Sequence, residues 1–167
     1  IAKNVRFLGR SAHAGGAPHL GVNALNAANL AMQGIALQRE TFREEDRIRI
    51  HPIITRGGVA VSSVPANVTM EMFIRAASVK AMKDAETKVD QALRAGAMAI
   101  GAGVEISTSP GYMPSKFSEE LNKVYDESVV ELIGESALGR MPHRTSSTDM
   151  GDVSAIMPAM QSYAGGA

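Results

Sequence analysis

The order of two kinds of apolar pattern in the first 110 or so residues constrains the fold of this chain more than any other feature. Four segments alternate apolar and polar residues, which is typical of β-strands: 4–11, 47–55, 68–76 and 104–108. Two segments repeat apolar residues every three to four positions, which is typical of helices: 23–40 and 79–100. The order strand, helix, strand, strand, helix, strand predicts an α+β, ferredoxin-like βαββαβ domain with a four-stranded antiparallel sheet and two helices on one face.

Single residues predict how these segments begin, end and pack. Ser78 is expected to cap the helix over 79–100, and Gly101 is expected to end it. Pro52 has no backbone N–H to donate, so the strand over 47–55 is expected at an edge of the sheet. The alanine-rich helix over 23–40 has a smooth surface that another helix can approach closely, although the high helix propensity of alanine is the simpler explanation.

The pattern changes after Pro114. Residues 118–134 predict an amphipathic helix, 139–147 are polar without a period, and 153–163 predict an apolar strand interrupted by Pro158. One helix and one strand cannot enclose a core. We therefore expect one domain over 1–112, and over 113–167 a fragment of a second domain that lies mostly outside this chain, which would be a piece of a longer protein.

Composition argues against several functional classes. Lys plus Arg and Asp plus Glu number 17 each, so the formal net charge is zero and binding of nucleic acid through bulk charge is not expected. No apolar run approaches the roughly 20 residues that span a membrane. The chain has no cysteine, which excludes disulfides, thiolate zinc sites and a cysteine nucleophile. The lack of cysteine fits a cytoplasmic protein.

Four histidines are candidate functional residues: His13, His19, His51 and His143. His13 and His19 flank a Gly/Pro-rich turn between a strand and a helix, which could present an imidazole to a ligand. Spacing alone favours two ordinary surface histidines, and the pair is a poor metal site without a nearby carboxylate or cysteine. His51 is expected to be packed or exposed at the sheet edge, and His143 to lie in a solvated loop.

Three further candidates lie in turns or at strand ends. Gly57 and Gly58 could offer backbone N–H groups to an anion, with an ordinary hairpin connection as the favoured alternative. Arg75 closes a strand and could hold a carboxylate through two hydrogen bonds, or it could be an ordinary surface arginine. Asp149, in a run of hydroxyls and carboxylates over 146–152, could orient a ligand or a metal-bound histidine, with a helix cap or Asx turn as the alternative.

Three separated motifs resemble the M20 metallopeptidase and amidohydrolase family. Residues 9–18 (GRSAHAGGAP) and 21–25 (GVNAL) are similar to the sequence that begins the lid domain of that family. Residues 51–58 (HPIITRGG), 64–65 (VP) and 73–75 (FIR) resemble its GG-x-x-x-N-x-x-P and arginine elements. Residues 147–154 (STDMGDVS) resemble the branch that contains aminobenzoyl-glutamate hydrolases. The motifs follow the order of the family and cover nearly the whole chain.

The resemblance implies an enzyme with two domains. A larger α/β domain would bind two divalent metal ions, usually zinc, and a smaller ferredoxin-like lid would form a homodimer. His13 would reach into the partner's active site and polarise the scissile carbonyl of a small amide substrate, while Arg75 would hold the carboxylate of the substrate. Gly57, Gly58, Ser62 and Asp149 are the other expected substrate-binding residues. Ser62 stands where the family has asparagine, and its shorter side chain cannot make the same contact unaided.

The metal-binding segments of the family are not in this sequence. We therefore expect this chain alone to bind no metal pair and to hydrolyse nothing. The main interpretation is part of a metal-dependent hydrolase that cleaves an N-acyl or aminobenzoyl amino acid amide beside a free carboxylate. The alternative is a non-catalytic dimerisation or small-ligand-binding module. In a dimer, the helix over 23–40 and the strand over 47–55 are expected to meet their symmetry mates.

Overall fold

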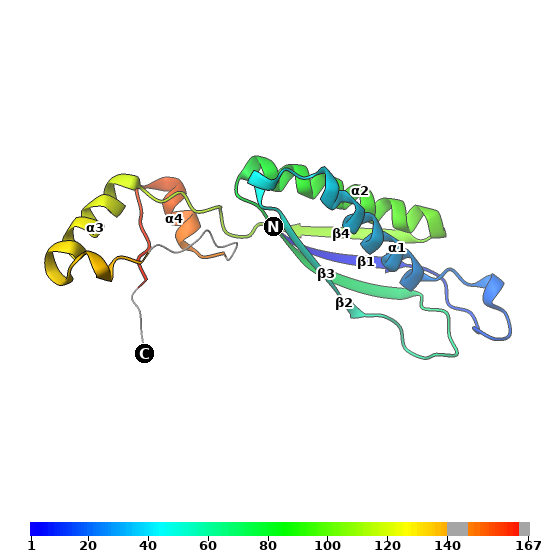
Figure 1. The fold of residues 1–167 in the computed structure, drawn as a ribbon. Helices are drawn as coiled ribbons and strands as arrows, with labels where there is room; N and C mark the ends of the chain where they lie inside the picture. Colours follow the sequence, from blue (N-terminus) through cyan, green and yellow to red (C-terminus); the bar gives the residue numbers. More distant parts are fainter. Residues whose placement is uncertain (140–146, 164–167) are drawn as a thin grey trace. The chain divides into compact units, whose positions relative to one another are not determined.

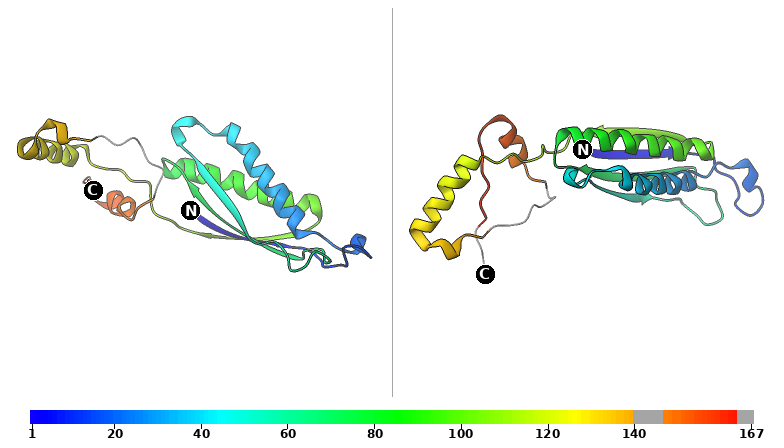
Figure 2. Two further views of the ribbon diagram at one scale, coloured as in Figure 1. Left: turned by 60° about the horizontal axis from the view of Figure 1, so that its bottom comes forward. Right: turned by 45° about the horizontal axis from the view of Figure 1, so that its top comes forward.

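The computed structural model describes residues 1–139 and 147–163 and divides the chain into two compact units, Ile1–Gly111 and Tyr112–Ala167 (Figure 1). Every residue of the first unit is described. Its strands and helices follow in the order β1 (Ala2–Leu8), α1 (Ala24–Leu37), β2 (Arg49–Arg56), β3 (Asn67–Arg75), α2 (Val79–Ile100) and β4 (Gly103–Ser109). The strands form one antiparallel sheet in the order β2-β3-β1-β4. Both helices cover the same face (Figure 2), so the predicted ferredoxin-like fold is confirmed.

The core of the first unit lies between the sheet and the two helices. Alternate residues of β1 and β3 point into it, because side chains of a strand face opposite sides in turn. These residues are buried: Val5, Phe7, Val68, Met70, Met72 and Ile74. The helices contribute the buried Ala24, Ala27, Ala28, Ala31 and Ile35 of α1 and Met82, Ala85, Val89, Leu93 and Ala97 of α2. The core is therefore built from small and aliphatic side chains, with Phe7 as its one buried ring.

The alanine face of α1 packs on α2 within the same unit. A Cβ atom placed on Gly96 of α2 would lie 2.6 Å from the backbone nitrogen of Ala31 and 2.7 Å from the carbonyl oxygen of Ala27. Only a glycine in α2 and small residues in α1 permit this approach. The smooth surface predicted for 23–40 thus serves the packing of the two helices inside one domain.

Side-chain caps fix where the helices begin. The Asn23 side chain accepts hydrogen bonds from the backbone N–H groups of Leu25 (2.9 Å) and Asn26 (3.1 Å), and α1 starts at the next residue. Ser78 caps α2 by accepting from Ala81 N–H at 3.2 Å, as predicted. Gly101 ends α2 in the left-handed region with φ 72°.

The predicted bounds of three elements need a small correction. The strand over 4–11 lies at Ala2–Leu8, because Arg10 already exchanges backbone hydrogen bonds with Val22 at the base of the following loop. The helix over 23–40 ends at Leu37, because the chain tightens into a 3₁₀ turn over Gln38–Thr41. The strand over 47–55 starts at Arg49, since Arg47 has a positive φ of 47° that breaks the extended backbone. That strand, β2, is an edge strand as Pro52 predicted. The other 3₁₀ turns are Pro18–Leu20, Glu44–Asp46 and Glu135–Ala137.

The second unit contains α3 (Glu119–Ile133) and α4 (Met150–Ile156) among its described residues. The helix predicted over 118–134 is confirmed, and Ser118 caps it by accepting from Leu121 N–H at 3.3 Å. The strand predicted over 153–163 is wrong. Its first residues belong to α4, and the side chains of Asp152 and Ser154 accept hydrogen bonds from the backbone N–H groups of Met113 (2.8 Å) and Lys116 (3.0 Å).

Two parts of the second unit are outside the described residues, 140–146 and 164–167. They include His143 and most of the polar stretch over 139–147. Through residues 1–139 and 147–163, the helices are too short or too polar to cross a membrane.

Candidate functional site

Two connections meet at one end of the sheet of the first unit. Residues 9–23 join β1 to α1 and residues 57–66 join β2 to β3; we call them the paired loops (Figure 1). Ala14 N–H donates to the carbonyl oxygen of Ser62 at 2.8 Å, and Val64 N–H donates to that of Ala12 at 2.9 Å. The hydroxyls of Ser11 and Ser63 are 2.8 Å apart. These hydrogen bonds hold the two loops together and place His13 next to Ser62.

The base of the first loop is closed by backbone bonds. Arg10 and Val22 exchange N–H···O=C hydrogen bonds of 3.0 and 2.9 Å, so the chain leaves and returns at neighbouring points. Gly9 lies against this closure, and a Cβ atom there would overlap the carbonyl oxygen of Val22. A side chain at position 9 therefore has no room, and the backbone hydrogen bonds between Arg10 and Val22 hold the loop at the end of β1.

His13 is exposed in this loop, and one of its two ring nitrogens accepts hydrogen bonds. Its Nδ1 accepts hydrogen bonds from the backbone N–H groups of Gly16 at 2.8 Å and Gly15 at 3.2 Å. The His13 carbonyl oxygen accepts from Ala17 N–H at 2.9 Å, which closes the turn that carries both glycines. The ring is thus fixed to its own loop through one nitrogen, and Nε2 remains available to a ligand.

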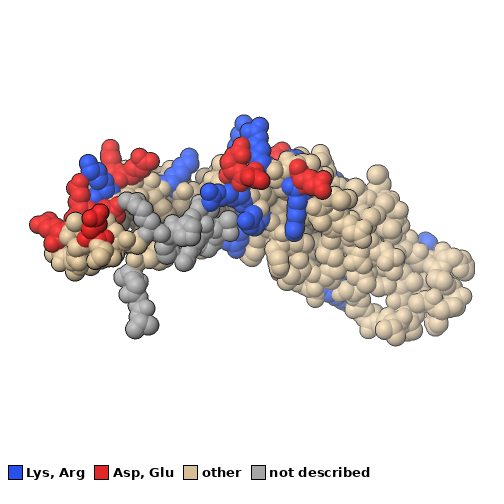
Figure 3. Space-filling view, in the orientation of Figure 1, with Lys and Arg blue, Asp and Glu red and all other residues tan. Residues whose placement is uncertain are grey.

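The surface around His13 is almost free of charge. Residues 11–38 contain no Lys, Arg, Asp or Glu, and neither do residues 57–66. The end of the first unit that carries the paired loops accordingly shows little blue or red in Figure 3. Leu20, Val59 and Val61 are exposed there. Arg10, whose side chain donates to the Leu20 carbonyl oxygen, is the one charged residue of the paired loops, and His13 is otherwise surrounded by Gly, Ala, Ser and Val residues.

Gly57 and Gly58 begin the second of the paired loops, directly after β2. Gly58 has φ 152°, a conformation that residues with a side chain rarely adopt. Ser62 lies further along this loop and is exposed. Ser62 is a neighbour of His13 through the Ala14–Ser62 hydrogen bond, whereas Gly57 lies near Leu25 and Ile54 and Gly58 near Pro65.

Arg75 lies at the other end of the sheet. In the antiparallel pair of β1 and β3, Leu8 is opposite Asn67 and Ala2 is opposite Phe73, so β3 begins beside the paired loops and ends far from them. Nine residues of strand span about 27 Å. The Arg75 guanidinium stacks over the Phe73 ring at 5.3 Å. One copy of the chain therefore does not bring His13 and Arg75 together.

This separation was missed by sequence reasoning, although a signal existed. The fold class alone pairs β1 antiparallel with β3, so a residue after the end of β1 lies beside the start of β3. Arg75 is the last residue of β3 and is placed by the same rule at the opposite end.

The other candidates are dispersed. Asp149 lies in the second unit just before α4, is exposed, and accepts a 3.1 Å hydrogen bond from the Thr148 hydroxyl. His19 is exposed in the 3₁₀ turn of the first paired loop, and His51 is exposed on β2. Across residues 1–139 and 147–163, no three His, Asp or Glu side chains are arranged to hold a metal ion.

A buried ion cluster in the first unit was also missed. Lys3 of β1 is buried, and its ammonium lies 3.1 Å from a Glu86 oxygen, 2.8 Å from Asp90 Oδ1 and 2.8 Å from the Thr108 hydroxyl. The contact with Asp90 is an ion pair without hydrogen-bond geometry. Burial raises the pKa of Glu86, but hydrogen bonds from Lys83 and Lys3 outweigh it, and the pKa lies below its ordinary value of 4.5.

Comparisons with known proteins identify relatives of this chain. Residues 2–99 match the sequence model of a family described as the M20 peptidase dimerisation domain. The chain is 32% identical over 164 residues to Xaa-Arg dipeptidase of Mus musculus, which covers 95% of the chain and 37% of that protein. It is 28% identical over 138 residues to a Haemophilus influenzae homolog of one p-aminobenzoyl-glutamate hydrolase subunit, covering 81% of the chain and 30% of the relative.

The fold is also found among solved structures. The aminobenzoyl-glutamate utilization protein of Klebsiella pneumoniae superposes with a TM-score of 0.71 at 22% identity, over 92% of this chain and 39% of that one. The chain thus spans well under half the length of each of these relatives.

Proposed function

The chain belongs to the M20 peptidase dimerisation-domain family, and we propose that it is the lid, together with part of the catalytic domain, of a metal-dependent hydrolase. The proposed substrate is a small amide, an N-acyl, aminobenzoyl or aminoacyl amino acid, cleaved beside a free carboxylate. The names of two relatives, a dipeptidase and an aminobenzoyl-glutamate hydrolase, describe bonds of this kind. The two divalent metal ions, zinc in the family resemblance, belong to the complete enzyme, and no described residue of this chain is assigned to them.

The exposed imidazole of His13 is the observation that carries this proposal. It is held on its loop by the Gly15 and Gly16 amides, and Arg10 is the one charged residue of the paired loops, which suits insertion into the cleft of another copy of the chain. There His13 would donate a hydrogen bond to the oxygen of the scissile carbonyl. Such a donor stabilises the negative charge that develops on that oxygen in the transition state.

Arg75 would bind the free carboxylate of the substrate, because a guanidinium can donate two parallel hydrogen bonds to it. A strand length of about 27 Å separates Arg75 from the paired loops, far more than the length of a small amide substrate. We therefore assign His13 and Arg75 of one chain to two different active sites. Each site of the homodimer would combine Arg75 of one protomer with His13 of its partner.

The remaining candidates keep supporting roles in this proposal. Gly57, Gly58 and Ser62 would line the substrate beside His13, since they lie in the neighbouring paired loop. Asp149 would contribute from the catalytic domain, where it could orient the substrate or a metal-bound histidine.

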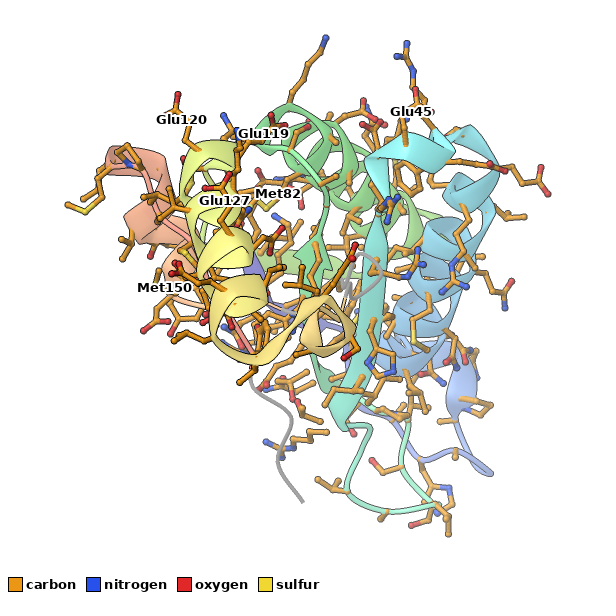
Figure 4. All side chains as sticks on the ribbon, turned by 60° about the vertical axis from the view of Figure 1, so that its left-hand side comes forward. Glu45, Met82, Glu119, Glu120, Glu127 and Met150 are labelled. Atoms are coloured by element: carbon orange, nitrogen blue, oxygen red, sulfur yellow. The ribbon has the colours of Figure 1, made fainter. Side chains whose placement is uncertain are left out.

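The second unit is proposed to be a piece of that larger catalytic domain. Among its described residues only Gly151 and Ala159 are buried, and α3 buries none of its residues. Glu119, Glu120 and Glu127 extend from α3 into solvent (Figure 4). Its apolar Leu121, Val124 and Val130 are exposed too, and in a complete domain they would pack against a neighbouring element.

Complementation between two inactive variants tests this proposal most directly. In the complete hydrolase, His13→Ala and Arg75→Ala homodimers should each lose activity, with kcat for His13→Ala falling by about 10²–10³-fold, as for the loss of one oxyanion donor. When the two variants are unfolded together and refolded, a heterodimer has one site with both wild-type residues. Activity should therefore return to a substantial fraction of the wild-type value, measured as hydrolysis of an aminobenzoyl amino acid.

The control is Arg94→Ala, which removes an exposed arginine of α2 that has no assigned role and should leave kcat unchanged. If the mixed variants stay as inactive as each homodimer, His13 and Arg75 do not share a site across the dimer. An unchanged kcat for His13→Ala would remove His13 from the mechanism and favour a non-catalytic dimerisation module.

A further inference from the structure

The two amide groups that meet the His13 ring determine which of its nitrogens can carry a proton. Gly16 N–H and Gly15 N–H both donate to Nδ1, at 2.8 and 3.2 Å. A nitrogen that accepts these hydrogen bonds must present its lone pair and cannot itself carry hydrogen. The neutral ring then has its proton on Nε2.

We propose that Gly15 and Gly16 are positioning residues that hold His13 as the Nε2–H tautomer. This inference deepens the proposed function and rests on it for the role of the donor. Nε2 is then a hydrogen-bond donor toward substrate and has no lone pair with which to take a proton. His13 would therefore polarise a carbonyl as a neutral donor and would not act as the general base.

Two further backbone hydrogen bonds fix the turn that carries the Gly15 and Gly16 amides. Ala17 N–H closes it on the His13 carbonyl oxygen at 2.9 Å, and Ala14 N–H anchors it to Ser62 of the other paired loop at 2.8 Å. A Cβ atom on Gly16 would lie 3.3 Å from His13 Nδ1, tighter than an ordinary contact. On Gly15 the nearest ring atom would be 3.6 Å away, which is an ordinary contact. Glycine at position 16 thus lets its N–H approach the ring closely.

Nuclear magnetic resonance of the ¹⁵N-labelled 167-residue chain tests the tautomer without any assay of activity. At about pH 8 an exposed imidazole is neutral, and the ¹⁵N shifts of its two nitrogens report which one is protonated. We expect His13 to be almost entirely Nε2–H, a larger share than for the exposed His19 and His51 in the same spectrum. We also expect a scalar coupling across the hydrogen bond between the Gly16 amide nitrogen and His13 Nδ1.

Two glycine variants show whether the amides cause this preference. Gly16→Ala should push the ring away and reduce or abolish the coupling, while Gly15→Ala, with an ordinary contact, should keep it. A His13 tautomer ratio equal to that of His19 and His51, with no coupling in the wild-type chain, would overturn the inference. That result would leave the complementation test between His13→Ala and Arg75→Ala unaffected, so the two proposals can fail separately.

Activity of the complete enzyme gives a second readout. The side-chain amide of glutamine reaches about as far as Nε2 and can donate a hydrogen bond, whereas asparagine places its amide near the position of Nδ1. His13→Gln should therefore retain more of the wild-type kcat than His13→Asn. Equal losses in both variants would contradict a role as a neutral donor through Nε2.

Discussion

Lys3 shows how one side chain can join three elements of the first unit. It shares a face of β1 with Val5 and Phe7, so its ammonium is carried into the layer between sheet and helices. There it contacts Glu86 and Asp90, one turn apart on α2, and Thr108 on β4. A buried ammonium is tolerated only when it is paired in this way.

The stability of the first unit should therefore depend on the charge of Glu86. The pKa of this carboxyl is below 4.5 in the folded chain, so its charged form favours folding. The stabilisation by the charged Glu86 carboxylate is fully present above about pH 4.5. It is lost as the pH falls through the lower pKa that Glu86 has in the folded chain. Urea unfolding followed by circular dichroism between pH 7 and 3 should show the loss, and Glu86→Gln should lower stability at pH 7 by about 1–3 kcal/mol with a shallower decline in acid.

A second ion pair on β1 provides the matched control. Arg6 and Glu105 are 3.1 Å apart on the exposed face of the sheet. Glu105→Gln should change stability at pH 7 by less than about 1 kcal/mol, because exposed pairs contribute little. Equal effects of Glu86→Gln and Glu105→Gln would contradict the importance of burial.

At the residue scale, the sequence predicted positions better than contacts. The motif around His13 and the alternation at Val5 and Phe7 placed these residues correctly in a loop and in the core. The amides on His13 Nδ1 come from a backbone turn, and no side-chain pattern encodes them. The pairing of Lys3 with Glu86 joins residues 83 positions apart, which only the packing of α2 on the sheet brings together.

The close contact between α1 and α2 depends on glycine residues, which have no side chain. Gly96 lies so close to the backbone of Ala27 and Ala31 that even a methyl group has no room. Gly34 of α1 faces Ala92 of α2 less tightly, with 3.2 Å from its Cβ position to the Ala92 Cβ atom. Replacing Gly96 by alanine would therefore require a larger shift of the neighbouring helix than replacing Gly34 by alanine.

Alanine substitution should separate these two positions. In a helix interior, Gly→Ala gains about 1 kcal/mol from propensity, but overpacking costs about 1–3 kcal/mol or more. Gly96→Ala should destabilise the chain, because the methyl group would meet backbone atoms. Gly34→Ala should lie within about 1 kcal/mol of the wild type, and stabilisation by Gly96→Ala in urea unfolding would contradict the observed packing.

Elements with a long, regular pattern were predicted well. The helix over 79–100 has the same bounds in the structure, and the four strands agree within a few residues. The segment over 153–163 failed because a short apolar run does not distinguish strand from helix. What stabilises α4 there is a pair of side-chain bonds to residues 113 and 116, about 40 positions earlier, which local sequence cannot reveal.

At the scale of the whole molecule, the proposed homodimer has to cover exposed apolar groups near α1 and β2. Leu37 at the end of α1 is 73% exposed, and Ile53 of the edge strand β2 is 49% exposed. Association of two copies along these elements would bury both side chains twice, as a two-fold axis requires. A stable interface of this kind buries about 1,600 Å² in total.

Charged substitutions should dissociate that dimer. We expect the wild-type chain to show the mass of a dimer by size-exclusion chromatography with light scattering, and Leu37→Glu and Ile53→Glu to shift it toward monomer upon dilution. Leu132→Glu of α3, where the leucine is 81% exposed, should leave the mass unchanged. A wild-type chain that is monomeric at every concentration would contradict the proposed interface.

In the proposed enzyme, the length of the sheet sets the distance between the paired loops at one end and Arg75 at the other. One residue inserted into β1 or β3 would exchange the buried and exposed faces beyond it. Two residues inserted into both strands would preserve the faces but move the paired loops about 7 Å farther from Arg75. In the proposed homodimer, that displacement would exceed the reach of any hydrogen bond, so the proposal requires β1 and β3 to keep their present lengths. Under the same proposal, adaptation to longer or shorter substrates would come from the loops, with the sheet held constant.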